Sequence, residues 1–177
     1  MKKLLTALVI LIYFVPISFF GVAYAISKQE VQEPSLFGAF LIPMLLMIAV
    51  CIVVTISIIG ARHSVARSQY LPFRTALVYK LCLIPFYILN FACWMIASMV
   101  FHIALFIWPF IPFIIGYTYY SMIGTSVHII AKLYALRQSN KISTKQLTIH
   151  SLFQILFVTD VIDSIYLAIK QNKYDLS

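Results

Sequence analysis

The sequence predicts an all-α fold, a polytopic helical membrane protein with a four-transmembrane-helix bundle and a C-terminal helix at the cytoplasmic side. Of its 177 residues, 63% are hydrophobic and 10% are charged, whereas soluble domains carry about 25% charged residues. A soluble chain of this length could not bury so much apolar surface, but helices that cross a bilayer expose theirs to lipid. We therefore expect lipid to be the solvent for most of the chain.

The positions of the basic residues predict how the chain is threaded. Of the thirteen Lys and Arg residues, twelve fall in four patches, and one simple threading places all four on the same side of the membrane. Lys and Arg concentrate in cytoplasmic loops, so that side is expected to be the cytoplasm, with both termini there. The exception is Lys28. The twelve residues are Lys2, Lys3, Arg62, Arg67, Arg74, Lys80, Lys132, Arg137, Lys141, Lys145, Lys170 and Lys173.

The first span is expected over residues 4–25. This apolar run is long enough to cross ~30 Å of hydrocarbon at ~1.5 Å per residue, despite Pro16. Residues 1–25 could instead be a cleaved signal peptide, because the segment 23–25 has the small-x-small pattern of a cleavage site. We expect a retained span, since the run is longer than the usual h-region of about 7–15 residues.

The second span is expected over residues 36–59, after a short outer loop at 26–35 that carries both glutamates. Pro43 lies near the outer end of this span, where a missing backbone donor is easiest to tolerate. Gly60 is expected to end the span. Residues 61–80 are basic and interrupted by Pro72, which predicts a cytoplasmic elbow beside the lipid headgroups.

Two further spans are expected in residues 81–131, a stretch of fifty-one residues without a charge. One span needs about 20 residues, so this stretch accommodates two spans and a turn. The turn is expected at residues 108–112, where two prolines break helix and Trp108 suits the outer interface. The third and fourth spans are then 81–107 and 113–136, and residues 1–136 form the transmembrane bundle.

Residues 137–177 are expected to form a cytoplasmic linker, with helix resuming at about Ser143, and a C-terminal helix. Residues 152–169 have nearly the length of a span but contain Gln154, Asp160 and Asp163. Each mid-helix Asp costs about 2.5–3.5 kcal/mol on insertion, and the eleven Leu, Ile, Val and Phe residues return only about 0.3–0.6 kcal/mol each. Apolar residues go nearly all the way round, which predicts a helix packed at the cytoplasmic ends of the bundle. The alternative is five transmembrane helices.

Span four carries a polar face. Two adjacent rows of side chains share it because helical residues three and four apart are neighbours. We expect a packing seam between helices, and the alternative is the lining of a solute site or pore. The rows are Gly116, Tyr120, Gly124 and His128, and Tyr117, Ser121 and Thr125.

Asn90 in span three lies at a similar depth to this polar face. It is expected to form a polar node with Tyr120, Ser121 or Thr125, of which the simplest form is an interhelical hydrogen bond. With His128, these residues are the candidate intramembrane site.

Asp160 and Asp163 form a carboxylate pair on one helix face. Such a pair can bind a cation or relay protons, but the many basic residues on the same side of the membrane favour a salt bridge to the cytoplasmic elbow.

Sequence motifs for metal, nucleotide or nucleophilic chemistry are absent, so we expect no catalytic residue, no cofactor and no metal site. The three cysteines, Cys51, Cys82 and Cys93, lie in apolar runs without CxxC spacing, and we expect them to act as small hydrophobic residues. The net charge of +8 favours anionic lipid at the cytoplasmic face over nucleic acid, because no basic stripe interleaved with aromatic residues occurs.

These features predict a small, non-enzymatic integral protein of a plasma membrane, and the short loops favour a bacterial one. We expect an accessory or self-protection (immunity-type) component that acts on another membrane protein. The alternative is a small-solute or ion transporter or channel, which would work as a homo-oligomer because four spans enclose little room. An intramembrane enzyme that uses His128 or the two aspartates is the weakest interpretation.

Overall fold

The computed structural model describes residues 1–27, 33–67, 69–99 and 111–176. These ranges contain helices and short connections, with no strand among them, so the predicted all-α fold is confirmed. The helices are α1 (Lys2–Ser27), α2 (Glu33–Arg67), α3 (Phe73–Met99), α5 (Ile111–Gln138), α6 (Thr144–Phe153), α7 (Phe157–Ile169) and α8 (Gln171–Leu176).

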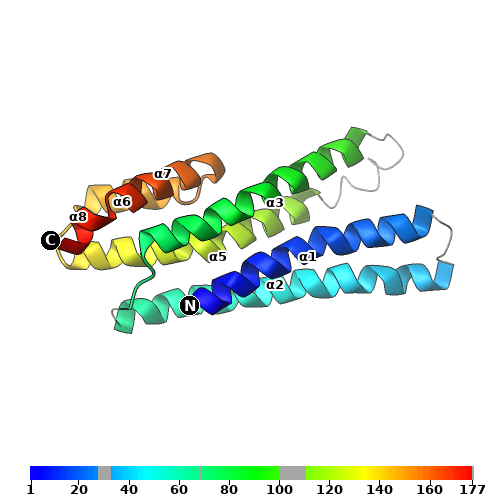
Figure 1. Ribbon diagram of the computed structural model, residues 1–177, viewed down its shortest axis with the longest axis horizontal. Coiled ribbons are helices and arrows are strands. Elements are labelled where there is room, and N and C mark those ends of the chain that lie inside the picture. The colour runs from blue at the N-terminus through cyan, green and yellow to red at the C-terminus, as the bar shows by residue number, and fades with distance from the viewer. Residues whose placement is uncertain (28–32, 68, 100–110, 177) are drawn as a thin grey trace.

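The long helices α1, α2, α3 and α5 lie side by side (Figure 1). Helix α2 packs against α1 and α5, while α3 packs against α1, α5 and α7. Three of the described helices are long and apolar enough to cross a membrane, in segments Lys2–Val22, Leu41–Arg67 and Phe73–Ala92. This supports the predicted membrane protein. Helix α5 is not among the three, in keeping with its tyrosine, serine, threonine and histidine side chains.

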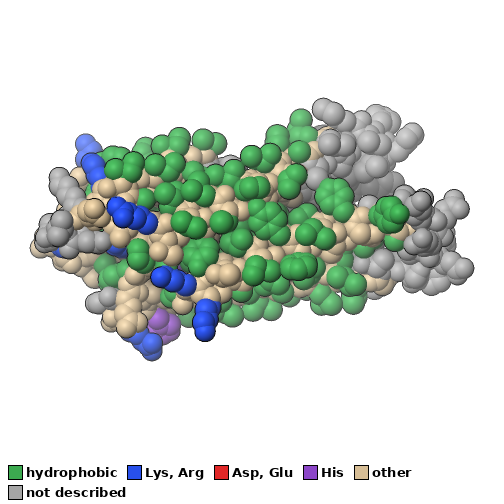
Figure 2. Space-filling model, in the orientation of Figure 1, with side chains coloured by type: hydrophobic (Ala, Val, Ile, Leu, Met, Phe, Trp, Pro, Cys, Tyr) green, Lys and Arg blue, Asp and Glu red, His purple; other side chains and the backbone are tan. Residues whose placement is uncertain are grey.

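The start of α1, the end of α2 and the start of α3 lie together at one end of the molecule. The Tyr79 hydroxyl in α3 donates to the Lys2 carbonyl at 3.0 Å. A Cβ added to Gly60 in α2 would lie 3.0 Å from the Met1 sulfur. Figure 2 shows the visible Lys and Arg side chains toward this end, and hydrophobic side chains covering the rest of the described face. We call it the basic end.

The helices bury apolar side chains between them and also expose many outward. Leu8 in α1 and Val54 in α2 are fully buried, whereas Ile17 in α1 is 60% exposed and Ile88 in α3 is 63% exposed. Water would oppose such an outer surface, but hydrocarbon accommodates it without cost. The large exposed side chains therefore agree with a protein surrounded by lipid.

The prediction that Gly60 ends the second helix is wrong. Helix α2 continues to Arg67 and α3 already begins at Phe73, so the predicted elbow at 61–80 is mostly helical. A single glycine lowers helix stability by only about 1 kcal/mol, which neighbouring turns can offset. Pro72 instead marks the start of α3, because the residue before a proline is disfavoured in the helical region.

The predicted turn at residues 108–112 lies mostly outside the described residues. Its last part is helical, because α5 begins at Ile111 and includes Pro112. Proline is well tolerated in the first turn of a helix, where its missing N–H would have no intrahelical acceptor.

The predicted single C-terminal helix is three helices, so that expectation is wrong in detail. The expected resumption of helix is confirmed, because Ser143 caps α6 in a capping box with Gln146. The chain reverses after Phe153 with no Pro or Gly to mark the break, and α6 and α7 form a hairpin (Figure 1). Helix α7 has 13 residues, fewer than the ~20 that a fifth span would need.

Candidate functional site: a buried polar network at the basic end

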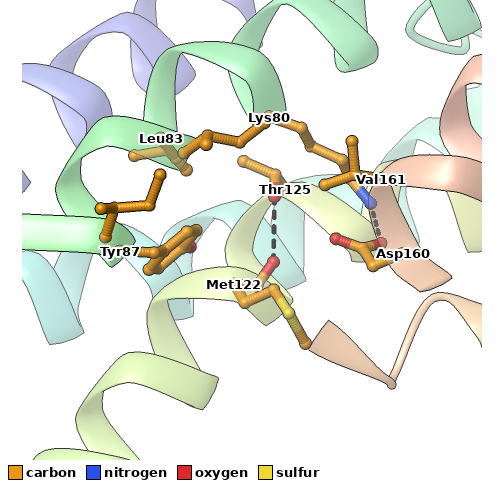
Figure 3. Close-up of a pocket in the computed structure, with 9 residues that line it drawn as sticks. Lys80, Leu83, Tyr87, Met122, Thr125, Asp160 and Val161 are labelled. Atoms are coloured by element: carbon orange, nitrogen blue, oxygen red, sulfur yellow. Dashed lines mark hydrogen bonds and ion pairs between the residues drawn. The ribbon is translucent and has the colours of Figure 1, made fainter. Parts of the chain in front are cut away.

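A buried lysine lies at the centre of the most extensive polar network in the described chain. The Lys80 ammonium in α3 forms a salt bridge with Asp160 in α7 (Figure 3). It also donates to Gln154 Oε1 at 2.5 Å and to Ser126 Oγ at 3.1 Å. An ammonium has three N–H donors, so all of them have acceptors inside the protein.

Gln154 extends the network from Lys80 to the second aspartate. Its amide donates to Asp163 Oδ2 at 2.7 Å and to Ser164 Oγ at 3.3 Å. His150 Nδ1 lies 2.5 Å from Asp163 Oδ1. The two aspartates therefore have different partners, a lysine from α3 and a histidine from α6, and the network joins α3, α5, α6 and α7.

The network is almost completely shielded from solvent. The exposed fraction is 3% for Lys80, 2% for Asp160 and 1% for Gln154. Burial raises the pKa of the Asp160 carboxyl, while the Lys80 ammonium and the Ser126 hydroxyl act in the opposite direction. A buried ion pair is tolerated only when its geometry is good and its remaining donors and acceptors are satisfied. The neighbouring amide and hydroxyl groups provide these hydrogen-bond partners.

The predicted salt bridge from the aspartate pair to the elbow is confirmed for Asp160, because Lys80 is the last residue of that predicted segment. The described residues contain no group of three His, Cys, Asp or Glu side chains that could hold a metal ion. The contacts of this network join side chains from α3, α5, α6 and α7.

His128 in α5 pairs with α2. The Ser57 hydroxyl donates its single proton to the Gly124 carbonyl at 2.8 Å, so His128 Nε2, also 2.8 Å away, must be the donor toward Ser57. A histidine that activates a serine nucleophile has the opposite polarity, because it accepts the serine proton. The pair is thus arranged to join two helices.

The other candidate intramembrane residues have the following partners. Asn90 donates to Thr118 Oγ1 at 3.1 Å, which links α3 to α5. The Tyr120 hydroxyl lies 2.7 Å from Thr55 Oγ1 in α2. Within α5, Ser121 donates to the Thr118 carbonyl and Thr125 to the Met122 carbonyl.

Helix α5 thus makes hydrogen bonds toward two neighbouring helices, from its polar face to α2 and from the adjacent Thr118 to α3. Tyr120 and His128 reach α2, whereas Thr118 receives Asn90 from α3. Gly124 lies at a close contact on this face, because an added Cβ would approach Leu8 Cδ2 to 3.0 Å and Val54 Cγ2 to 3.1 Å. These contacts have the character of a packing seam.

A cavity of about 60 Å³ lies between α3, α5 and α7 (Figure 3). Lys80 and Asp160 are at its polar side, and Leu83, Tyr87 and Met122 contribute to its lining. Sites for drug-sized ligands have volumes of roughly 300–1,000 Å³, whereas one water occupies about 30 Å³ of liquid. The volume of the cavity therefore suits water and is too small for a drug-sized ligand.

Residues 1–173, almost the whole chain, match the model of DUF6652, a family of unknown function. The chain belongs to this family. Neither the curated proteins nor the solved structures gave a match to the chain. Membership covers the long helices and the C-terminal hairpin together, and it assigns no activity.

Sequence reasoning missed most of the network around the aspartates. It counted Gln154 as an obstacle to insertion, although this side chain connects Lys80 to Asp163. A signal was present in the residues of α7 taken alone. There the buried Asp160, Asp163 and Ser164 lie on one face, and the longer window 152–169 obscured this pattern by including the hairpin turn.

Proposed function

We propose that the protein is a non-enzymatic integral membrane component that acts by binding another membrane protein, as an accessory or self-protection subunit. In this proposal α5 is a fourth span, and the protein lies in a plasma membrane with its basic end and both termini in the cytoplasm. The preference of Lys and Arg for cytoplasmic segments supports this orientation. The length of α5, 28 residues, is sufficient for a span.

The functional proposal rests on the hydrogen-bond partners of the polar side chains in the long helices. Ser57 pairs with His128, Thr55 with Tyr120, and Asn90 with Thr118. Groups that transport a solute must face a path and exchange partners with it. Here the polar groups form hydrogen bonds between helices. We therefore assign the function to the outer surface of the protein.

Purification from native membranes in mild detergent tests the proposal. We expect a second membrane protein to co-purify with the C-terminally tagged chain, and the same pair to form again from separately purified components in lipid vesicles. Recovery of the chain alone, or of copies of itself only, would show that the proposed binding function is wrong.

A small-solute or ion transporter that works as an oligomer is the second candidate. The cavity beside Lys80 and Asp160 favours it, because a charged pair adjoins space of water size within the helices. Flux into vesicles is the test, with Asn90→Ala and His128→Ala as variants and Tyr119→Phe as control, since Tyr119 is 42% exposed. Unchanged flux in both variants would eliminate a path along the polar face.

A further inference from the structure

Helix α7 has the inverse of the polarity expected for a helix at a water-exposed surface. Its polar residues Asp160, Asp163 and Ser164 are turned toward the protein and are at most 4% exposed. Its opposite face is apolar and exposed by 41–73%, at Val158, Ile162, Ile165 and Ile169. The spacing of these four residues, i, i+4, i+7 and i+11, defines one continuous helical face.

The end of α6 and the turn that follows it continue this apolar surface. Leu152, Phe153, Ile155 and Leu156 are each 41–55% exposed. No Lys, Arg, Asp or Glu occurs from residue 146 to residue 159, whereas Lys141, Lys145, Lys170 and Lys173 flank the open end of the hairpin. The hairpin is thus apolar at its tip and basic at its base, as expected of a segment that enters hydrocarbon from an anionic headgroup region.

The length of the hairpin fits one leaflet. Helix α6 has 10 residues and α7 has 13, or roughly 15 and 20 Å at 1.5 Å per residue. One leaflet contributes about 15 Å of hydrocarbon, half of the ~30 Å core. Helix α7 also packs on α3, where Val78 and Leu81 are exposed apolar residues beside the Lys80 position. The apolar surface of α3 and that of the hairpin therefore lie next to each other.

We propose that the α6–α7 hairpin is inserted into the leaflet at the basic end, where lipid acyl chains cover the outer face of α7. The surrounding lysines then lie at the level of the anionic headgroups. Tyr166 marks the same level, because Lys170 lies over its ring at 4.2 Å to the centroid and tyrosine is favoured at membrane interfaces. This inference does not depend on the proposed partner-binding function.

Single-tryptophan variants in vesicles with brominated acyl chains test the insertion. In a background with Trp94→Phe and Trp108→Phe, tryptophan is placed at Val158 near the tip or at Ile169 near the base. These positions are 70% and 73% exposed and about 16 Å apart along the helix. Gln138→Trp, at the exposed end of α5, is the matched control.

We expect bromines near the methyl end of the chain to quench Val158→Trp most strongly, and bromines near the headgroup to quench Ile169→Trp most strongly. Gln138→Trp should keep most of its fluorescence. Equal depth for the two α7 positions would overturn upright insertion. Absence of quenching at both positions would overturn lipid contact altogether, and cross-linking between Val158→Cys chains would then identify a second copy of the protein as the occupant.

Discussion

Replacing Lys80 by methionine is expected to release the α6–α7 hairpin from α3. The substitution keeps an unbranched side chain of similar length but removes the ammonium that binds Asp160, Gln154 and Ser126. The Asp160 carboxyl, 2% exposed, is then left in a site with no opposite charge. It must either take up a proton or move into contact with solvent, and both outcomes weaken the attachment of α7.

The magnitude follows from the burial of both partners. Removing one partner of a buried ion pair costs about 3–5 kcal/mol, because the other charge is left uncompensated. At about 1.4 kcal/mol per tenfold change, the open state of the hairpin should become roughly 10²–10⁴ times more populated. Replacing both partners, in Lys80→Met with Asp160→Leu, should restore much of the loss, since apolar substitution of a whole pair is often neutral.

Cysteine labelling measures this opening directly. Ala168 in α7 is 5% exposed, so a thiol at Ala168→Cys reacts only when the hairpin separates, provided that Cys51, Cys82 and Cys93 are replaced. The labelling rate should rise in Lys80→Met in proportion to the open population. Lys145→Met, at an exposed position on α6, is the matched control and should leave the rate unchanged.

The reasoning would be refuted by a labelling rate in Lys80→Met equal to that of the parent. It would also be refuted if the double variant opened as readily as the product of the two single effects predicts, because the pair would then contribute no coupling energy.

Two further predictions concern the seam between the long helices. Gly124→Ala should lower the unfolding free energy in detergent by about 1–3 kcal/mol, because fully buried Leu8 and Val54 resist the added methyl group. Gly116→Ala, which meets nothing within 4 Å, should be neutral or slightly stabilising, and equal losses in both variants would contradict the proposed close contact. Tyr120→Phe should cost roughly 0.6–1.7 kcal/mol through its lost bond to α2, measured by thermal unfolding, and a comparable loss in Tyr119→Phe would count against that assignment.

The fold could be predicted from the sequence wherever a residue acts through its own hydrophobicity or charge. The apolar runs predicted the positions of the long helices. The basic residues on one side of the membrane predicted a salt bridge from the aspartate pair to the elbow, which ends at Lys80, and Asp160 forms it. The polar face of α5 was also visible from spacing alone, and its Ser121, Thr125 and His128 are buried.

What could not be predicted depends on contacts between distant segments. The reversal after Phe153 has no local breaker, and it is stabilised by Gln154, whose side chain contacts Lys80 seventy-four positions away. The choice of Ser57 as the partner of His128 likewise depends on how α2 and α5 are rotated about their axes. Neither propensity nor periodicity contains that information.

The inverted polarity of α7 implies an order of assembly. Its carboxylates have no charge partner within α7, and Asp160 finds Lys80 eighty positions earlier in the chain. Entry of the isolated segment into lipid is unfavourable because each unpaired Asp costs about 2.5–3.5 kcal/mol. In the proposed insertion, the hairpin would therefore enter after α3 has been integrated and offers its lysine, so the C-terminal segment would be the last to mature during membrane biogenesis.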